Sequence, residues 1–217
     1  MGTSRRKLKA ERKRREILRA AAGAFKKRGF YGTTMEDISS ELLMTQGSLY
    51  YYFKSKEEIL FACHEHSLAE MLDVLDRVRN VDAAAPAKLH ALIEAHVAIM
   101  IDDLAASAMA LEFTALSEPY LSQIIAMRDR YEQGLRDIIR SGIDAGEFLP
   151  ANPRLTGFAI LGAINWIARW FRSQGPLAAE AVGRQFADLF LRSLGVDPGS
   201  VQDLFPGHGS GSPLGGR

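Results

Sequence analysis

The chain has 217 residues, of which 47% are hydrophobic and 24% are charged, and this composition is typical of a soluble globular protein. Its single cysteine, Cys63, excludes an intramolecular disulfide framework and a cysteine-based zinc site, and it favours a reducing, cytoplasmic location. No apolar run reaches the roughly 18–20 residues that span a bilayer, and no apolar stretch follows the basic N-terminus, so we expect neither a membrane helix nor a secretory signal.

The net charge of +1 hides a strong asymmetry along the chain. Residues 1–32 hold 12 basic and two acidic side chains, whereas the other 185 residues hold 15 basic and 24 acidic ones. Such an asymmetry favours a polyanionic partner for the N-terminal end. A solvated basic tail without a partner explains the charge run equally well.

Helical periodicity dominates the N-terminal region. A first helix is predicted over 16–29, where apolar residues recur at helical spacing and Gly29 stands at the position of a C-cap. A second, short helix is predicted to begin near Thr33 or Thr34, because Thr33 and Glu36 have the spacing of a capping box.

Two further helices follow after very short connections. The third is predicted over 45–53, with Thr45 as its N-cap. The fourth is predicted over 56–79, where Ser55 and Glu58 have the spacing of another capping box.

The rest of the chain reads as longer helices and a tail. Helices are predicted over 87–104, 106–116, Pro119 to near Gly146, Asn152–Pro153 to about Ser173, and 178–194. Residues 195–217 contain seven Gly, three Pro and three Ser, so we expect a disordered tail over 196–217. Without any alternating β pattern or internal repeat, the sequence predicts an all-α fold of about nine helices, with a basic head over 1–55 and a helical body over 56–195.

Two short helices behind a packing helix form the helix-turn-helix arrangement, whose second helix enters the major groove of DNA. In the segment TQGSLYYYF, Leu49 and Phe53 are four residues apart and are expected to pack inward together. The residues left to face outward are Thr45, Gln46, Gly47, Ser48, Tyr51 and Tyr52.

The chemistry of these side chains suits DNA. Gln46 can read adenine edges, Ser48 and Thr45 can reach bases or phosphates, and Gly47 allows a close approach of the backbone. Lys56 adds a charge beside a helix N-terminus, where anions are already favoured. The alternative is an amphipathic helical hairpin whose tyrosines are half-buried.

The body carries no catalytic constellation, so we expect neither an enzyme nor a cofactor. His64 and His66 flank Glu65 but lack the spacing that places two zinc ligands on one helix face, so no metal site is expected. His90 and His96 lie on a helix that must also pack. All four histidines are therefore expected to be structural or exposed to solvent.

The helix predicted from Pro153 is unusually apolar, which predicts that it is covered on most sides. Asn165 and Arg169 form a polar stripe on it, and a buried arginine needs an anionic partner. That partner is either a neighbouring acidic side chain or an anionic ligand.

Residues 13–62, and in particular GFYGTTMEDI, GSLYYYF and SKEEIL, resemble the N-terminal domain of TetR-type transcriptional repressors. The resemblance implies a homodimer on a near-palindromic operator, a recognition helix at 45–53, and a ligand-binding body whose last two helices form the dimer interface. Carried over by position, the residues that would face DNA are Thr34, Gln46, Gly47, Ser48, Tyr50, Tyr51, Tyr52 and Lys56.

One position departs from the family pattern. The family usually has Ala-Gly at the turn between the second and third helices, where this chain has Leu42 and Leu43. Because glycine there relieves the strain of a positive φ, Leu43 implies either a slightly different turn or a local energetic cost.

The segments INWIARWFRSQGPL and VGRQFADLFLRSLG resemble the subgroup of TetR-type repressors that respond to acyl-coenzyme A thioesters, which links the protein to fatty-acid or related degradation. This resemblance implies a ligand site formed by Met100, Met109, Phe113, Leu116, Asn165, Trp166, Arg169 and Trp170. Arg128 or Arg172 would assist Arg169 at the phosphates. The alternative effector is a neutral or cationic lipophilic compound, as in regulators of drug efflux.

Overall fold

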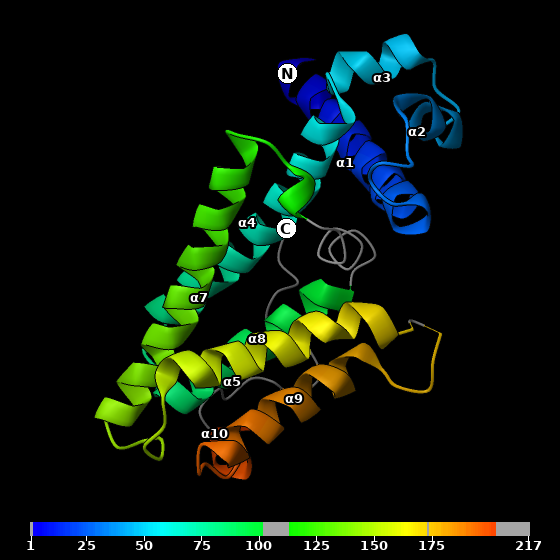
Figure 1. Ribbon diagram of the computed structural model, residues 1–217. Helices are drawn as coiled ribbons and strands as arrows, with labels where there is room; N and C mark the ends of the chain where they lie inside the picture. Colours follow the sequence, from blue (N-terminus) through cyan, green and yellow to red (C-terminus); the bar gives the residue numbers. More distant parts are fainter. Residues whose placement is uncertain (1, 102–112, 173, 203–217) are drawn as a thin grey trace. The chain divides into compact units, whose positions relative to one another are not determined.

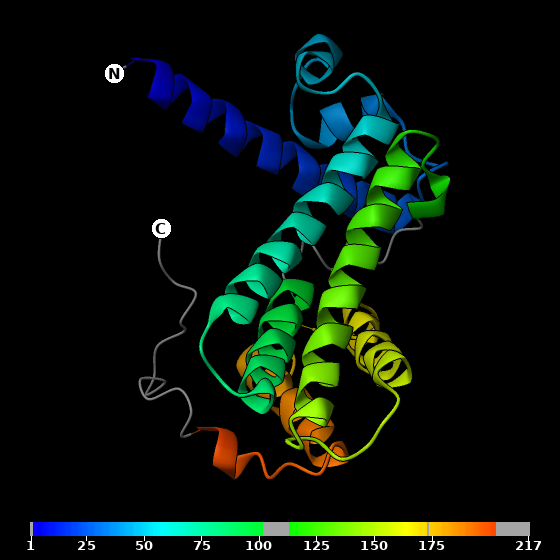
Figure 2. The ribbon, with the colours of Figure 1, turned by 90° about the vertical axis from the view of Figure 1, so that its left-hand side faces the viewer.

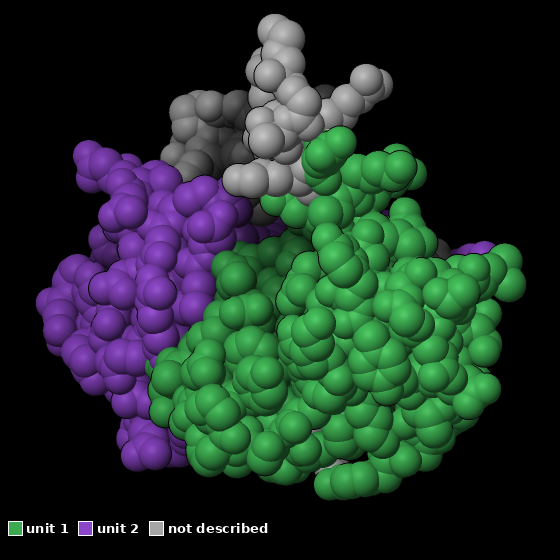
Figure 3. Space-filling model, turned by 90° about the horizontal axis from the view of Figure 1, so that it is seen from above, with its two compact units in different colours: residues 1–70, 99–129, 167–171 green, residues 71–98, 130–166, 172–217 purple. Residues whose placement is uncertain are grey.

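The computed structural model describes residues 2–101, 113–172 and 174–202, and the regular elements in these ranges are all helical (Figure 1). The all-α prediction is therefore confirmed for this part of the chain. The chain divides into two compact units, which Figure 3 colours separately. Unit 1 comprises residues 1–70, 99–129 and 167–171, and unit 2 comprises residues 71–98, 130–166 and 172–217.

Unit 1 begins with α1 (Gly2–Arg28), which starts about four turns earlier than the predicted helix over 16–29. The sequence prediction relied on apolar periodicity, and the first turns have none. They consist instead of strong helix formers, chiefly Arg, Lys, Ala and Glu, without proline between residues 3 and 28. Figure 2 shows the N-terminal end of α1 with no other helix beside it.

The head continues with two short helices, α2 (Met35–Glu41) and α3 (Gln46–Tyr52), and the long helix α4 (Lys56–Asn80) follows it. Their bounds agree with the predicted helices within two residues. Phe25, Ile38 and Leu49, one each from α1, α2 and α3, are at most 1% exposed and belong to the core of this unit, in which α2 packs against both α1 and α3. Burying a side chain of this size stabilises a fold by about 1.5–3 kcal/mol, so this small core holds the two short helices in place.

The rest of unit 1 comes from the body. It contains the end of α5 (Ala85–Ile101), the 3₁₀ turn η1 (Phe113–Ala115) and the first part of α7 (Tyr120–Asp144). Most of the helix predicted over 106–116 lies outside the described residues, and its described end is η1.

Unit 2 contains the remainders of α4, α5 and α7, most of α8 (Pro153–Trp170), and α9 (Ala179–Ser193). The start of α8 confirms the predicted N-cap, since the Asn152 side-chain oxygen accepts hydrogen bonds from the Arg154 and Leu155 amides at 3.0 and 3.2 Å.

A further helix, α10 (Gly199–Gln202), was not predicted. Val201 on this helix is 3% exposed, so the prediction of a disordered tail is wrong for residues 196–202. Composition favoured a tail there, but a buried valine shows that this turn packs against other residues. The remainder of the predicted tail, 203–217, lies outside the described residues.

Among the described helices, none is long and apolar enough to cross a membrane. The same residues contain no group of three or more His, Cys, Asp or Glu side chains arranged to hold a metal ion.

Candidate nucleic-acid interface

Helix α2 begins at a capping box that lies one residue beyond the predicted one. The Thr34 hydroxyl oxygen accepts a hydrogen bond from the Asp37 amide at 3.1 Å, and the Thr34 amide donates to the Asp37 carboxylate at 2.8 Å. The pKa of Asp37 is lowered chiefly by the hydrogen bond that the Thr34 hydroxyl donates to its carboxylate at 2.7 Å, and then by the one from the Thr34 amide. The predicted pair of Thr33 and Glu36 is wrong, because Thr33 is buried and its hydroxyl donates to the Gly29 carbonyl at 2.8 Å. Thr34 is exposed at the start of α2.

The turn between α2 and α3 contains a leucine in the left-handed region. Leu42 has an ordinary φ of −91°, whereas Leu43 has a φ of 51°. The chain then folds back, and the Met44 amide donates to the Ser39 carbonyl at 2.9 Å. Of the two alternatives for Leu43, the structure therefore shows the local cost rather than a different turn. The Leu43 side chain is 96% exposed, so burial does not offset that cost.

The inward face of α3 is built by two residues, as their spacing predicted. Leu49 and Phe53 are both 0% exposed. The Arg14 guanidinium of α1 lies 4.2 Å from the centre of the Phe53 ring and donates to the Tyr52 carbonyl at 3.4 Å. This cation–π contact fixes the C-terminal end of α3 against α1.

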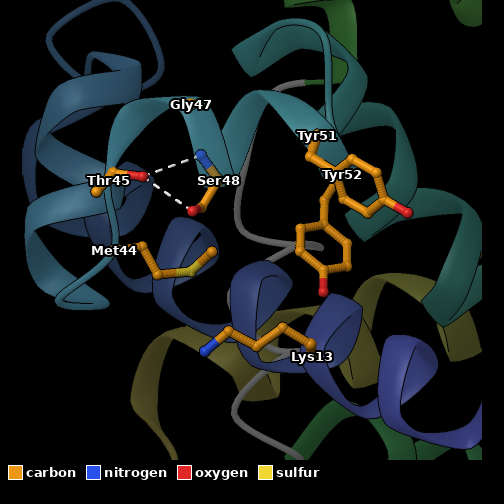
Figure 4. A pocket seen from close by; sticks show the side chains of 7 residues that line it. All are labelled: Lys13, Met44, Thr45, Gly47, Ser48, Tyr51 and Tyr52. Carbon is orange, nitrogen blue, oxygen red and sulfur yellow. Dashed lines mark hydrogen bonds between the residues drawn. The ribbon is translucent and has the colours of Figure 1, made fainter. Parts of the chain in front are cut away.

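The first turn of α3 presents short polar side chains on the surface. The Thr45 hydroxyl accepts a hydrogen bond from the Ser48 amide at 3.2 Å, and the two hydroxyls share another at 2.9 Å, as Figure 4 shows. This confirms Thr45 as the N-cap. Gln46 and Gly47 are exposed beside them.

The three tyrosines of α3 differ in exposure. Tyr51 is 78% exposed, Tyr50 is 42% exposed and Tyr52 is half-buried. The rings of Tyr51 and Tyr52 meet edge to face, with their centres 5.2 Å apart. The alternative of a hairpin with half-buried tyrosines therefore describes Tyr52 but not Tyr51.

Side chains from α1, the turn and α3 border an open hollow of about 580 Å³ (Figure 4). Its lining residues are Lys13, Met44, Thr45, Gly47, Ser48, Tyr51 and Tyr52. The sequence prediction missed Lys13 and Met44 as individual residues. The charge asymmetry pointed to the basic run as a whole, but it could not give the helical phase that turns residue 13 toward α3.

Lys56 does not lie as predicted. Its ammonium group donates to the Phe30 and Thr33 carbonyls at 2.9 Å and to the Tyr31 carbonyl at 3.3 Å, and it lies over the Phe30 ring. Lys56 thus closes the loop between α1 and α2. Because its three donors are directed at that loop, we leave Lys56 out of the proposed DNA contact surface.

The residues predicted to bind an effector fall into two sets. In unit 1, Met100 and Leu116 are at most 3% exposed, and Phe113 is partly exposed. Met109 lies outside the described residues. Asn165 belongs to unit 2 and is partly buried.

The second set, which includes Asn165, lies on α8, where Asn165 and Trp166 belong to unit 2 and Arg169 and Trp170 belong to unit 1. Trp166 is 59% exposed, Trp170 is 38% exposed and Arg169 is exposed too. The prediction of a buried arginine and of a helix covered on most sides is therefore wrong for the single chain. Apolar composition alone cannot tell a helix buried within one subunit from one whose apolar face is exposed.

Two histidines of unit 2 have partners, as a structural role predicts. The His96 ring accepts or donates a hydrogen bond at 3.0 Å with the Tyr131 hydroxyl, and burial lowers its pKa to about 4. His90 lies 3.3 Å from Asp188 and 3.5 Å from Glu94. Burial alone would lower the pKa of His90, but the two carboxylates outweigh it and raise the pKa.

The two histidines of α4 differ from each other. His66 is partly exposed and lies 3.4 Å from a Glu70 carboxylate oxygen. His64 is 0% exposed, and neither of its ring nitrogens has a hydrogen-bond partner within the described part of the chain.

Comparison with known proteins agrees with this geometry. Residues 17–63 match the family described as bacterial regulatory proteins, tetR family, and residues 82–194 match the tetracyclin repressor-like C-terminal domain.

Solved structures give the same picture. The chain is 34% identical to the TetR family transcriptional regulator PfmR from Thermus thermophilus, with a TM-score of 0.75 over 81% of this chain and 97% of that one. It is 28% identical to the ketosteroid transcriptional regulator KstR2 of Mycobacterium tuberculosis, with a TM-score of 0.78 over 84% and 94%. It is also 28% identical to AibR, solved in complex with isovaleryl coenzyme A and operator DNA, with a TM-score of 0.70 over 89% and 98%.

Proposed function

Because the chain belongs to the TetR family of bacterial regulatory proteins, we propose that it is a transcriptional repressor without catalytic activity. It binds a palindromic operator as a homodimer and leaves the operator when a small hydrophobic effector binds its body. The observation that carries this proposal is the outward face of α3, which combines exposed polar side chains with an exposed tyrosine beside a basic helix.

The contact with DNA is made by α3 in the major groove. Gln46 reads a base edge, and Ser48 and Thr34 reach the backbone or a base from two helix N-termini. Tyr51 has both a ring for a thymine methyl group and a hydroxyl for a phosphate. The remaining members of the proposed contact surface are Thr45, Gly47, Tyr50, Tyr52 and Lys13.

The homodimer forms through α8 and α9. Leu155, Phe158, Trp166 and Trp170 are 38–64% exposed, and their spacing places them within one face of α8. Leu189 on α9 is 58% exposed. An exposed apolar face of this size favours association with a second copy of the chain, which spaces the two α3 helices by about 34–36 Å on the operator.

The effector is an acyl-coenzyme A thioester. This assignment is supported by the similarity to AibR, whose structure contains isovaleryl coenzyme A and operator DNA. It is also supported by the buried apolar residues Met100 and Leu116, which suit an acyl chain, and by the exposed Arg169, which suits a phosphate.

Electrophoretic retardation of the chain's own upstream promoter fragment tests the DNA-binding role. Tyr51→Ala is expected to abolish specific retardation, whereas Tyr31→Ala, which removes an 81% exposed tyrosine from the loop before α2, is expected to retain it. The apparent affinity should fall steeply with salt concentration, because the basic α1 displaces counterions from phosphates. Equal affinities of the Tyr51→Ala variant and the unaltered chain would remove α3 from the interface.

A thermal-shift panel of acyl-coenzyme A thioesters, free fatty acids and lipophilic drugs tests the effector class. A thioester at about 100 times its dissociation constant stabilises the folded state by about 2.7 kcal/mol, which raises the Tm by roughly 5–10 °C for a chain of this size. Stabilisation by a lipophilic drug and by no thioester would assign the protein to the drug-responsive class instead.

A further inference from the structure

His64 lies in the first half of α4, and neither of its ring nitrogens has a hydrogen-bond partner among the described residues. Burial, and then the charge of Arg128, lowers its pKa to about 4, so the ring is neutral at physiological pH. A neutral imidazole carries one N–H donor and one lone pair, and proteins rarely leave such atoms unpaired in the interior. The other fully buried histidine, His96, uses one nitrogen with Tyr131. His64 therefore needs an explanation that a packing role does not give.

The neighbours of His64 give that explanation. The centre of the Phe113 ring lies 6.3 Å from the His64 ring in an edge-on arrangement, and the Arg128 guanidinium lies 4.6 Å from the centre of the same Phe113 ring. Burial lowers the pKa of Arg128, and the carboxylate that opposes this effect belongs to the adjacent residue, Asp129. A buried hydrogen-bonding ring and a partly buried cation thus flank one phenylalanine.

The same face of α4 leads toward the DNA-binding head. Glu57, Phe61 and His64 follow at four- and three-residue spacing and lie on one side of the helix. The Glu57 carboxylate accepts hydrogen bonds from the Ser117 amide and hydroxyl at 2.7 and 2.6 Å, and Phe61 stacks on Tyr120 at 4.5 Å. The segment from Phe113 to Tyr120 therefore contacts α4 from His64 back to its first turn, next to Lys56 and the loop that this lysine closes.

We propose that His64 binds the effector, and that its imidazole hydrogen-bonds an acyl oxygen of that molecule while Arg128 supplies a facing positive charge. The oxygen is either the carbonyl of a thioester or the carboxylate of a free acid. This inference rests on the proposed acyl effector and adds the residue that recognises its polar group.

Binding at His64 also provides a route to the head. A ligand oxygen that binds the imidazole lies beside the Phe113 ring, and a shift of Phe113 displaces the segment that leads to Ser117. The two hydrogen bonds to Glu57 then weaken at the first turn of α4. The effector releases DNA to the extent that it prefers this displaced arrangement.

The His64→Leu variant tests the proposal, with His66→Leu as the matched control on the same helix. Leucine removes two unpaired polar atoms from the core and has a similar volume, so the variant is expected to be as stable as the unaltered chain or more stable. Its operator affinity without effector is measured as well, and release by effector is compared relative to that value. The isovaleryl- or palmitoyl-coenzyme A concentration that releases half of the operator is expected to rise about tenfold or more, the cost of one lost buried hydrogen bond. His66→Leu should respond as the unaltered chain does.

Two further arms complete the experiment. Isovaleric and palmitic acids, compared with their thioesters, show which source supplies the acyl oxygen, and coenzyme A alone is expected to have no effect. His64→Gln keeps a donor and an acceptor, so it is expected to retain more of the response than His64→Leu, and it also serves if the leucine variant fails to fold. Arg128→Gln is expected to weaken the response as well.

Ligand-induced thermal stabilisation is measured on the same samples, because this readout does not depend on DNA. If the unaltered chain fails to bind its promoter fragment but His64→Leu loses the thermal stabilisation, the DNA-binding proposal fails and the inference about His64 stands. Equal release and equal thermal stabilisation of His64→Leu and the unaltered chain would overturn the inference. So would the absence of any response of the unaltered chain to both the thioesters and the acids.

Discussion

Replacing Leu43 by glycine is expected to stabilise the protein, although it deletes a large apolar side chain. Leu43 occupies the turn between α2 and α3 with a φ of 51°, a region that side chains bearing a Cβ rarely adopt. The side chain is 96% exposed, so its removal sacrifices almost no buried area. The substitution therefore isolates the backbone strain of this turn from its packing.

The expected magnitude follows from two opposing contributions. The left-handed conformation costs an L-residue about 1–2 kcal/mol. Glycine avoids this cost, but it raises the conformational entropy of the unfolded chain and so loses about 0.5–1 kcal/mol. The net stabilisation is about 0.5–1 kcal/mol, which corresponds to a rise in Tm of roughly 1–4 °C for a chain of this length.

Leu42→Gly provides the matched control, because the two leucines are adjacent and differ in conformation. Leu42 has a φ of −91° and is partly buried, so glycine there loses conformational entropy and apolar contact without relieving strain. This variant is expected to be less stable by about 1 kcal/mol or more. Urea denaturation followed by circular dichroism measures both differences under identical conditions.

A higher free energy of unfolding for Leu43→Gly, together with a lower one for Leu42→Gly, would indicate backbone strain at residue 43. A Leu43→Gly variant that is destabilised to the same extent as Leu42→Gly would refute the reasoning. Operator affinity, measured on both variants, shows whether the stiffer leucine is also needed to hold α3 at its angle for DNA.

Three other predictions concern both units. Gly142→Ala is expected to destabilise the protein by about 1–3 kcal/mol in urea denaturation, because the added methyl group would overlap the buried Phe148 ring. His90→Gln is expected to lower the free energy of unfolding more at about pH 5.5 than at about pH 8.5. The raised pKa of His90 in the folded protein gives stability that is complete below the unfolded pKa of 6.5 and is lost as the pH rises through the folded pKa. A loss of stability that does not depend on pH would contradict this role of His90. Glu57→Gln weakens the hydrogen bonds from Ser117 at a cost of about 1 kcal/mol. Its operator affinity without effector, measured by fluorescence anisotropy, is expected to fall about fivefold. An unchanged affinity would show that this contact does not influence the position of the DNA-binding head.

The sequence predicted most helices because their starts carry local chemical signals. Thr45 as an N-cap and Asn152 before Pro153 are such signals, and both are confirmed. Where a signal has two equivalent positions, the sequence could not choose: Thr33 and Thr34 both precede a carboxylate by three residues, and only the burial of Thr33 against α1 decides between them. The first turns of α1 were missed because their helicity comes from residue propensity rather than from an apolar face.

The site was predicted less evenly, for a physical reason. Residues of α3 could be sorted into inward and outward sets from helix spacing alone, because the direction of each side chain depends only on its position within the same short helix. Lys56 could not, because its carbonyl acceptors lie 23 to 26 residues earlier in the chain. His64 could not be told from the other histidines, all expected to be structural or exposed to solvent, because its lack of a partner among the described residues is a property of the packed unit and not of the sequence around it.

The run of three tyrosines in α3 shows that helix spacing predicts the relative exposure of neighbouring side chains. Successive residues of a helix are rotated by about 100° around its axis. The direction midway between Leu49 and Phe53 therefore points to the core, and Tyr51 lies about 180° away from it. Tyr50 and Tyr52 then lie at about 80° to either side of the core direction. The exposures follow this order, with Tyr51 at 78%, Tyr50 at 42% and Tyr52 half-buried against Tyr51. Tyr51 therefore contributes surface without supporting the core, and a loss of operator affinity in its alanine variant reports a lost contact and not a damaged helix.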